Sequence, residues 1–320
     1  MPQANFLRIL IGISLLTKKS ITTVSGATLP VALTALFLLV LFLWLPTAPS
    51  RAESAGWALQ FDGTTDLVLF TTTNSMLGTG WEMTKTVSLW VKPTSSTLCA
   101  NHDVVMCDAI FGDRPRWWGI AIGDTSDGSD PTKDRIWVWN YDEYGLDAIG
   151  VEYTLGEWVN ITLIHEAGIL RAYKNGIQAG FKESGATVQP NYNAQPVLQL
   201  GGVIVSESRN WTFEGQIDEV QLWNRALTPS EINQYLYLPP AGNEPGLRAY
   251  YRMSDGPGSP TLTDDSLFDW TGTLVDGASG VPGDGTLPQW VSSDLIYPPL
   301  PEIQVYLPML MQNPVSGESN

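Results

Sequence analysis

The residues of this chain best suited to contact a ligand are the aromatic side chains of the segment Arg135–Tyr141. Alternation along a β-strand places Trp137, Trp139 and Tyr141 on one face of a sheet, and the aliphatic residues between them on the other face. A strand in a two-layer sandwich needs only one apolar face, so the aromatic face is left over. Together with Trp118 on a neighbouring expected strand, it is suited to stack on the apolar C–H face of a sugar ring. The alternative is that loops or a returning C-terminal segment cover these rings.

Catalytic side chains are scarce by comparison. The chain has two histidines, His102 and His165. A serine hydrolase would have to use one of them as its base, and no Gly-x-Ser-x-Gly nucleophile elbow occurs in the sequence. The residue types therefore favour binding over nucleophilic catalysis.

The two cysteines, Cys99 and Cys107, lie in a segment typical of a loop. In an exported protein the simplest expectation is one disulfide that pins this loop. A metal site has little support here, because His102 is the only histidine nearby and there is no second pair of cysteines.

The elements that must position these residues are expected to be β-strands. Gly (30) and Pro (22) are frequent and charged residues make up only 16% of the chain, which suits a turn-rich all-β protein. Short apolar and alternating runs recur between Trp57 and Trp223, separated by Gly, Asn, Asp and Pro. Asn175-Gly176 predicts a type I′ hairpin turn between two of these runs. No internal repeat of the length found in solenoids or propellers occurs, so the pattern predicts a sandwich or a barrel.

The segment from 215 to 232 combines a strand with the start of a helix. Gln216–Trp223 alternates as a half-buried strand does. Thr228 is expected to be the N-cap of a short helix, with Pro229 at the first helical position and Glu231 completing the capping box. We therefore expect one strand that leads into a short capped helix.

Five stretches of the sequence, taken in order, carry a resemblance to one family. They are Leu59–Gly63 followed by Asp66–Val68, then Val87–Pro93, Glu157–Leu163, Leu170–Gly176 and finally 215–232. The chain thereby resembles the laminin-G-like jelly-roll domains of the concanavalin A-like lectin/glucanase superfamily. The resemblance implies an all-β fold, a two-sheet antiparallel jelly-roll sandwich with a short helix after the closing strand.

The resemblance also implies a cofactor. Domains of this family often hold a structural Ca²⁺ between the opening and closing strands, which points to Asp62 and Asp218 as its ligands. The alternative is that Asp62 belongs to an Asp-Gly turn, while Asp218 is solvated or caps a backbone group.

The resemblance does not extend to catalytic residues. Glucanases with this fold place two carboxylates on one strand that reads Glu-x-Asp-x-Glu, as a retaining glycosidase requires. The nearest run in this chain is 216–219, where Gln216 stands in the place of the first Glu. This run also belongs to the closing strand rather than to the central concave strand.

The N-terminal residues 1–52 are expected to be a signal peptide. Val31–Leu45 is an apolar run of the length of a signal-peptide core, and Ser50-Arg51-Ala52 fits a cleavage site. A second apolar patch, Phe6–Leu16, leaves an uncleaved anchor open as an alternative. The protein is therefore expected to be secreted or held at the cell surface.

Residues 53–297 are expected to form one domain. The segment 246–290 follows the closing helix and resembles the stretch that usually precedes the opening strand of such a domain. About 50 residues could hardly bury a core of their own, so we expect this segment to return to the same sandwich. The alternative is the truncated start of a second module. Residues 298–320 have the composition of a Pro-rich C-terminal tail.

The charge limits the possible partners. The formal net charge is −16, and four of the 17 basic residues lie in the first 52 residues. No cluster of Lys and Arg follows, so nucleic acid is not an expected partner, and the mature domain is not expected to insert into a membrane. We expect an exported, non-catalytic module that binds carbohydrate or an extracellular protein. The alternatives are a structural or adhesive surface module that contacts protein and, less favoured, a polysaccharide hydrolase or lyase.

Overall fold

The computed structural model describes residues 56–70, 84–95, 108–114, 118–123, 135–142, 145–183, 197–206, 209–278 and 282–297. Two eight-stranded antiparallel sheets make up most of this part, and they form a sandwich. The sequence-based prediction of an all-β jelly roll with one short helix is confirmed. Within the described residues, no helix is both long enough and apolar enough to cross a lipid bilayer.

Sheet A has the strand order β10-β9-β8-β3-β14-β1-β18, and β15 pairs with β14 off this path. Its strands are β1 (Trp57–Asp62), β3 (Lys85–Pro93), β8 (Val159–Glu166), β9 (Ile169–Lys174), β10 (Ile177–Glu183), β14 (Glu214–Trp223), β15 (Leu247–Tyr251) and β18 (Gln289–Ser292).

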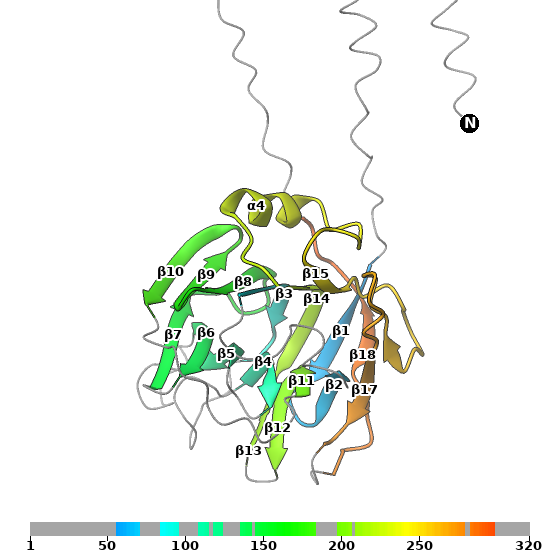
Figure 1. Ribbon diagram of the computed structural model, residues 1–320. Helices are drawn as coiled ribbons and strands as arrows, with labels where there is room; N and C mark the ends of the chain where they lie inside the picture. The colour runs from blue at the N-terminus through cyan, green and yellow to red at the C-terminus, as the bar shows by residue number, and fades with distance from the viewer. Residues whose placement is uncertain are drawn as a thin grey trace, which may run out of the picture. The chain divides into compact units, whose positions relative to one another are not determined.

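Sheet B has the order β16-β17-β2-β11-β4-β5-β6-β7. Its strands are β2 (Asp66–Phe70), β4 (Asp108–Arg114), β5 (Trp118–Gly123), β6 (Arg135–Asp142), β7 (Gly145–Val151), β11 (Val197–Leu200), β16 (Thr261–Leu262) and β17 (Gly272–Asp276). In Figure 1, strands β10, β9, β8 and β3 of sheet A lie above β7, β6, β5 and β4 of sheet B. Strands β12 (Gly202–Ser206) and β13 (Arg209–Thr212) form a separate two-stranded hairpin.

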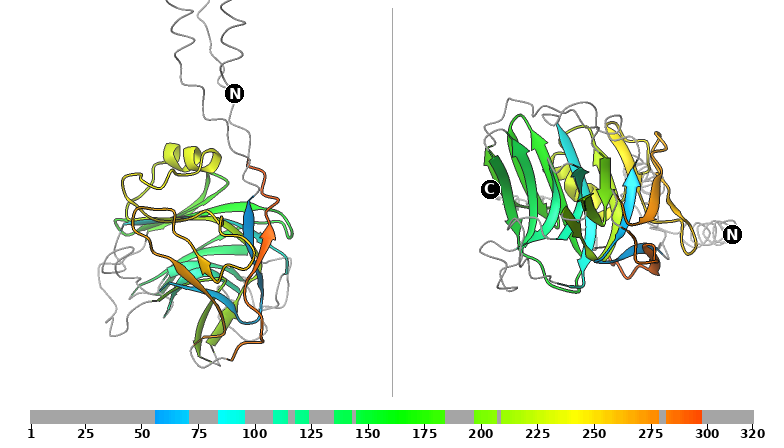
Figure 2. Two further views of the ribbon diagram at one scale, coloured as in Figure 1. Left: turned by 90° about the vertical axis from the view of Figure 1, so that its right-hand side faces the viewer. Right: turned by 90° about the horizontal axis from the view of Figure 1, so that it is seen from below.

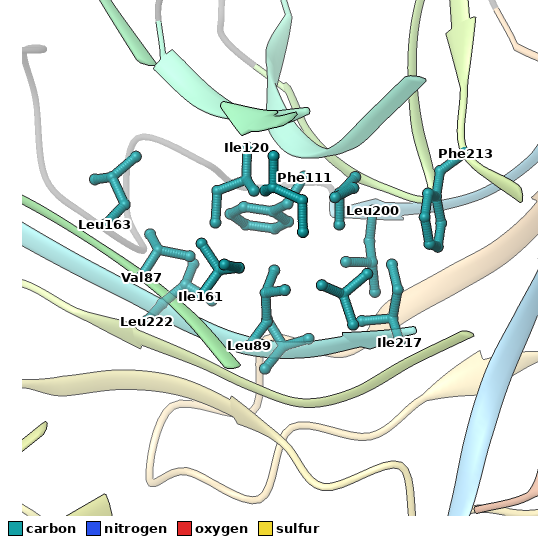
Figure 3. Packing of buried hydrophobic residues seen from close by; sticks show 14 of the residues in the cluster. Val87, Leu89, Phe111, Ile120, Ile161, Leu163, Leu200, Phe213, Ile217 and Leu222 are labelled. Atoms are coloured by element: carbon teal, nitrogen blue, oxygen red, sulfur yellow. The ribbon is translucent and has the colours of Figure 1, made fainter. Parts of the chain in front are cut away.

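Alternate residues of both sheets fill the space between them. Every second residue of a strand points to one face, so an apolar residue at alternate positions commits that face to the core. Figure 3 shows Val87, Leu89 and Ile161 of sheet A directed toward Phe111 and Ile120 of sheet B, all of them fully buried. Close packing of this core fixes the position of each sheet against the other. The residues on the outer faces of the sheets are thereby held in place as well.

Local sequence signals set the connections as expected. Asn175 and Gly176 both have positive φ, 48° and 79°, which is the type I′ turn predicted between β9 and β10. Helix α4 spans Pro229–Tyr237, and the Thr228 side chain accepts from the Glu231 backbone N–H as a capping box requires. Figure 1 shows α4 on the outer side of sheet A.

The segment after α4 adds strands to both sheets. β15 pairs with β14, and β18 pairs with β1, in sheet A. β17 pairs with β2 in sheet B and continues to β16. The left view of Figure 2 shows β18 beside β1. The C-terminal part of the chain is therefore built into the sandwich next to the opening strands.

Candidate functional site

The outer face of sheet B carries two tryptophans whose neighbours on the adjacent strands are glycine and alanine. Trp139 of β6 lies between Gly119 of β5 and Ala148 of β7 in the strand register, and Trp137 lies between Ala121 and Gly150. Residues directly opposite each other on paired strands share a face. The small neighbours leave room for two large indole rings to lie along the sheet.

Of the two indole rings, that of Trp137 is the one that reaches solvent. Its ring is half-buried, and a Cβ built on Gly150 would lie only 3.0 Å from the ring carbon Cη2. A side chain at position 150 would therefore displace the ring. The indole N–H donates to the Gly123 carbonyl over 2.9 Å, which fixes the ring orientation. The result is an oriented aromatic surface.

Polar groups border this surface. Arg135 precedes Trp137 by two positions on β6, so both side chains emerge on the same face, about 7 Å apart along the strand. The Arg135 guanidinium donates to Glu152 over 3.2 Å, and the Glu152 side chain is 79% exposed. An aromatic ring with a charged donor and acceptor beside it is the combination that binds sugar hydroxyls together with a sugar ring face.

Trp139 is covered, which corrects the expectation that it belongs to an exposed surface. It is 1% exposed and packs with Val203 and Trp211 of the β12–β13 hairpin. The alternative given by the sequence, that other segments cover the aromatic face, holds for Trp139, although the covering segment is this hairpin. Tyr141 continues the alternation in the backbone of β6, but its side chain lies outside the described part of the chain.

Trp118 was assigned to the wrong face. It is 5% exposed and belongs to the core between the two sheets, where its ring lies 5.8 Å from that of Phe111. In the register of β5 and β6, Trp118 is one position away from Gly119, the residue opposite Trp139. A shift of one position in a strand moves a side chain to the opposite face, so Trp118 cannot contact a ligand on the outer face.

Asp62 and Asp218 do not form a common metal site, which corrects the predicted ligand pair. Asp62 at the end of β1 lies opposite Glu214 on β14, and Leu59 lies opposite Ile217. Asp218 is therefore four positions away from the partner of Asp62, a separation of about 13 Å along the strand. A single Ca²⁺ holds its oxygen ligands at about 2.3–2.6 Å, so these residues do not fit it as a pair.

Both carboxyl oxygens of Asp218 accept hydrogen bonds from groups of the protein itself. The register between β14 and β3 shifts after Asp218, and Glu219 has a φ of 53°. This β-bulge turns two consecutive carboxylates to the outer side of sheet A. Asp218 accepts from the Ser293 hydroxyl over 2.7 Å, while the hydroxyls of Tyr250 and Tyr297 donate to Glu219.

Burial raises the pKa of Asp218 well above its usual value, and the charge of Glu219 raises it further. Both carboxylates are about 4% exposed. A glycosidase needs its two carboxylates to meet a substrate, and this pair lies beneath the C-terminal segment. At this degree of burial the pair is not accessible to a sugar.

The expected disulfide falls on residues that the structure does not describe. Cys99 and Cys107 lie outside the described residues. Within the described ranges, no three His, Cys, Asp or Glu side chains gather closely enough to hold a metal ion by themselves.

Sequence reasoning missed the border residues Arg135 and Glu152 and the small residues that flank the indoles. The signal was present as Gly119, Ala121 and Gly150, small residues at alternate positions of neighbouring strands. It becomes interpretable only when the strand register is known, because the register decides which glycine lies beside which ring.

Comparison with known proteins identifies the family of this chain. The family model described as the concanavalin A-like lectin/glucanases superfamily matches residues 62–233, which is more than half of the chain. The search of curated protein sequences gives no significant match.

Among solved structures, a candidate carbohydrate-binding protein from Bacteroides ovatus is 18% identical, with a TM-score of 0.54. The alignment covers 75% of this chain and 60% of that protein, so the chain spans less than two thirds of the length of that relative. At this identity the likeness shows the fold alone.

More distant matches include a SAP-like pentraxin from Limulus polyphemus, with 16% identity, a TM-score of 0.41, and 58% of this chain and 83% of that chain covered. Domain 4 of a GH43 extracellular arabinanase from Geobacillus stearothermophilus, solved with arabinotriose, has 22% identity, a TM-score of 0.39, and 55% and 75% coverage.

Proposed function

Because the chain belongs to the concanavalin A-like lectin/glucanases superfamily, we propose that it is a non-catalytic module that binds carbohydrate. The observation that carries this proposal is the half-buried Trp137 ring, oriented on the outer face of sheet B by its hydrogen bond to Gly123. An aromatic ring whose position is fixed loses little conformational entropy when a sugar stacks on it. Arg135 and Glu152 supply a donor and an acceptor at the edge of the ring.

The proposed ligand is an uncharged polysaccharide. The formal net charge of −16 repels anionic chains. The exposed border of the Trp137 surface pairs one cation with one anion, so it offers no net charge to a charged sugar. Stacking and hydroxyl hydrogen bonds then supply the affinity.

The absence of catalysis in this proposal rests on the two buried carboxylates of the closing strand. Asp218 and Glu219 are engaged by Ser293, Tyr250 and Tyr297 rather than directed at the Trp137 surface. They also lie on the outer side of the other sheet. No hydrolytic step is proposed for this pair, because a retaining mechanism needs one carboxylate at the anomeric carbon and one at the leaving oxygen.

Export is part of the proposal. Its support is the apolar run Val31–Leu45 followed by Ser50-Arg51-Ala52. A carbohydrate-binding module encounters polysaccharides outside the cell, so an N-terminal signal sequence and this ligand class agree. N-terminal sequencing of the protein recovered from the culture medium and from the membrane fraction tests this part. A chain found in the cytosol with its N-terminus intact would contradict it.

The experiment for the ligand is affinity electrophoresis of the full-length protein in gels that contain one polysaccharide each. The panel includes uncharged β-glucans, xylan, arabinan and mannan, with an anionic pectin as a charged comparison. We expect retardation by at least one uncharged polysaccharide and its loss in Trp137→Ala.

The matched control is Trp158→Ala. Trp158 is also half-buried and also has its indole N–H bonded, to Asp294 over 2.7 Å, and Lys92 lies 5.9 Å from its ring. Its substitution removes an equally large surface indole at a place outside the proposed site. No retardation by any polysaccharide, together with capture of a specific extracellular protein by the immobilised chain, would favour the adhesive alternative.

A further inference from the structure

A second group of exposed aromatic residues lies in the loop 263–271, which joins β16 to β17. The pairing of Thr261 with Thr273 makes this loop the tip of a hairpin at the edge of sheet B. The structure describes all of its residues, and Leu267 and Phe268 are its only exposed large apolar side chains, at 76% and 41%. Exposed apolar side chains that lie next to each other mark a candidate binding surface, whereas isolated ones do not.

The loop is held rigidly by a buried aspartate at its base. Asp264 is 5% exposed, and its Oδ1 accepts from the backbone N–H groups of Tyr250 and Ser266, both over 2.8 Å. Its Oδ2 accepts from the backbone N–H of Trp270 over 2.9 Å. The Ser266 hydroxyl in turn accepts from the backbone N–H of Phe268 over 3.2 Å. Hydrogen bonds to a carboxylate are stronger than those between neutral groups, so the loop presents Phe268 in one position.

The Phe268 ring is flanked by a cation and by a second aromatic ring. The guanidinium carbon of Arg248 lies 3.9 Å from the centroid of the Phe268 ring, which is a cation–π contact. The Trp270 ring lies 6.5 Å from the same centroid, and the two ring planes differ by only 12°. Trp270 is half-buried against the core, so it anchors the loop while Phe268 stays accessible. Because Arg248 covers one face of the Phe268 ring, the exposed part of the ring is directed away from Arg248.

Polar groups border the Phe268 ring, as they border Trp137. Arg248 supplies N–H donors beside the ring. Asp269 and Thr271 are exposed, and the Thr271 hydroxyl donates to the Asp269 carboxylate over 3.1 Å. A flat apolar ring with charged groups at its edge is able to stack on the C–H face of a sugar and to bind its hydroxyls. We call Arg248, Phe268, Asp269 and Thr271 the Phe268 surface.

The size of the Phe268 surface favours a sugar over a protein. A stable protein–protein interface buries about 800 Å² on each partner and has an apolar centre. In this loop, two apolar side chains are surrounded by exposed polar ones, at Thr263, Asp269 and Thr271. One aromatic ring matches one sugar ring in size. Leu267 is more exposed than Phe268 but has no flat face, so a sugar needs Phe268, whereas a protein contact would use both.

We infer that the Phe268 surface is a second carbohydrate-binding site, which stacks on a sugar residue of the same polysaccharide that the Trp137 surface binds. This inference rests on the carbohydrate function proposed above and adds a second point of attachment. A phenyl ring is smaller than an indole, and Arg248 covers one of its faces, so the second site is the weaker one. It strengthens binding when the Trp137 surface already holds the polysaccharide, because the second contact is then intramolecular.

The two surfaces are too far apart for a short ligand to reach both. In the order of sheet B, β17 is five strands from β6, a separation of about 24 Å at about 4.8 Å per strand. A trisaccharide is shorter than this separation, whereas a long polysaccharide spans it. The loop 263–271 also lies outside the segment 62–233 that matches the family model, so the second site belongs to the C-terminal segment.

The test compares a polymer with a short ligand made of the same sugar. Affinity electrophoresis of the full-length protein over a series of polysaccharide concentrations gives the dissociation constant for the polymer, and isothermal titration gives that for a trisaccharide. Phe268→Ala should weaken binding of the polymer by about 3–10-fold, the range of one aromatic stacking contact. It should leave the affinity for the trisaccharide unchanged, because the trisaccharide occupies the stronger Trp137 surface.

Two further variants separate the ring from the rest of the loop. Phe268→Tyr keeps an aromatic ring and should keep the wild-type affinity for the polymer. Leu267→Ala is the matched control, because it removes the neighbouring and more exposed apolar side chain but leaves the ring in place. Its affinity for the polymer should equal that of the wild type. Far-UV circular dichroism shows that each variant is folded before binding is measured.

Three results would overturn the inference. The first is binding of the polymer by Phe268→Ala at the strength of the Leu267→Ala control. The second is an equal loss of affinity in these two variants, which would indicate an apolar contact with no role for the ring. The third is an equal loss for polymer and trisaccharide in Phe268→Ala, which would place Phe268 in a single site. In all three cases the wild type still binds carbohydrate, so the proposed function stands. A wild type that binds no polysaccharide contradicts the proposed function and the second site together.

Discussion

Asp66→Asn is the substitution whose effect on stability follows most directly from the structure. The amide is nearly the same size as the carboxyl group, and its oxygen still accepts from the Asp62 backbone N–H. What the substitution removes is the ability of this buried group to become charged beside Asp62, Asp276 and Asp284.

The sign of the effect follows from the raised pKa. The folded protein holds the Asp66 proton up to a pKa of about 7, whereas the unfolded chain releases it near the ordinary value of 3.8. The stability contributed by this proton is complete below about pH 4 and is lost as the pH rises through about 7. The wild-type protein should therefore lose stability over this window through Asp66, and the asparagine variant should not.

The magnitude is set by the size of the pKa change and by screening. A change from 3.8 to about 7 corresponds to about 4 kcal/mol at 1.36 kcal/mol per pH unit. Asp62 and Asp284 are exposed, and water screens their charges, which reduces the expected effect to about 1–2 kcal/mol.

The assay is urea denaturation of both proteins in EDTA at several pH values from about 4.5 to about 8. The difference in unfolding free energy between Asp66→Asn and the wild type should increase by about 1–2 kcal/mol in favour of the variant, then level off above pH 7. Asp218 also has a raised pKa, but it is present in both proteins, so its contribution cancels in the difference. A difference that stays constant with pH would refute the reasoning, because Asp66 would then titrate as an ordinary carboxyl group.

Three further predictions concern the rest of the fold. Tyr297→Phe leaves one Glu219 oxygen without its hydroxyl donor and should lower the unfolding free energy by about 1–3 kcal/mol in urea titrations; an unchanged value would show that solvent replaces the donor. Thr228→Ala removes the N-cap of α4 and should cost about 1 kcal/mol in the same assay, most of which Thr228→Ser should restore. Cys99 and Cys107 are expected to form a disulfide in the exported protein; peptide mass spectrometry without reduction should find them linked, and two alkylated thiols would contradict this.

Features that depend on neighbouring residues in the sequence could be predicted. The capping box at Thr228 and the Asn175-Gly176 turn each act within a few residues, so the same residues give the same geometry in many contexts. The alternation in β6 likewise assigns Trp137 and Trp139 to one face without further information. Together with the order of the family landmarks, these signals were enough for the fold class.

Features that depend on which strands lie side by side could not be predicted. Trp118 was placed on the wrong face because the alternation within β5 does not say which of its faces turns toward sheet A. The β-bulge at Glu219 changes the direction of two side chains, and Asp218 is directed toward Ser293 rather than toward Asp62.

The contact between two Asp-Gly-Thr turns shows the same limit. Asp62-Gly63-Thr64 and Asp284-Gly285-Thr286 are separated by about 220 residues in the sequence, and the pairing of β17 with β2 brings them together. Nothing local to Asp284 distinguishes it from other loop aspartates. Only the fold makes it a neighbour of Asp62.

The measurement that tests the central claim most directly is isothermal titration of an oligosaccharide from the retained polysaccharide into three proteins: the wild type, Trp137→Ala and Trp158→Ala. If Trp137 is the stacking surface, its loss should weaken binding by about tenfold or more, equivalent to about 1.4 kcal/mol, while Trp158→Ala keeps the wild-type affinity. Equal affinities of the wild type and Trp137→Ala would contradict the proposed site, and the absence of binding to every sugar tested would contradict the proposed function.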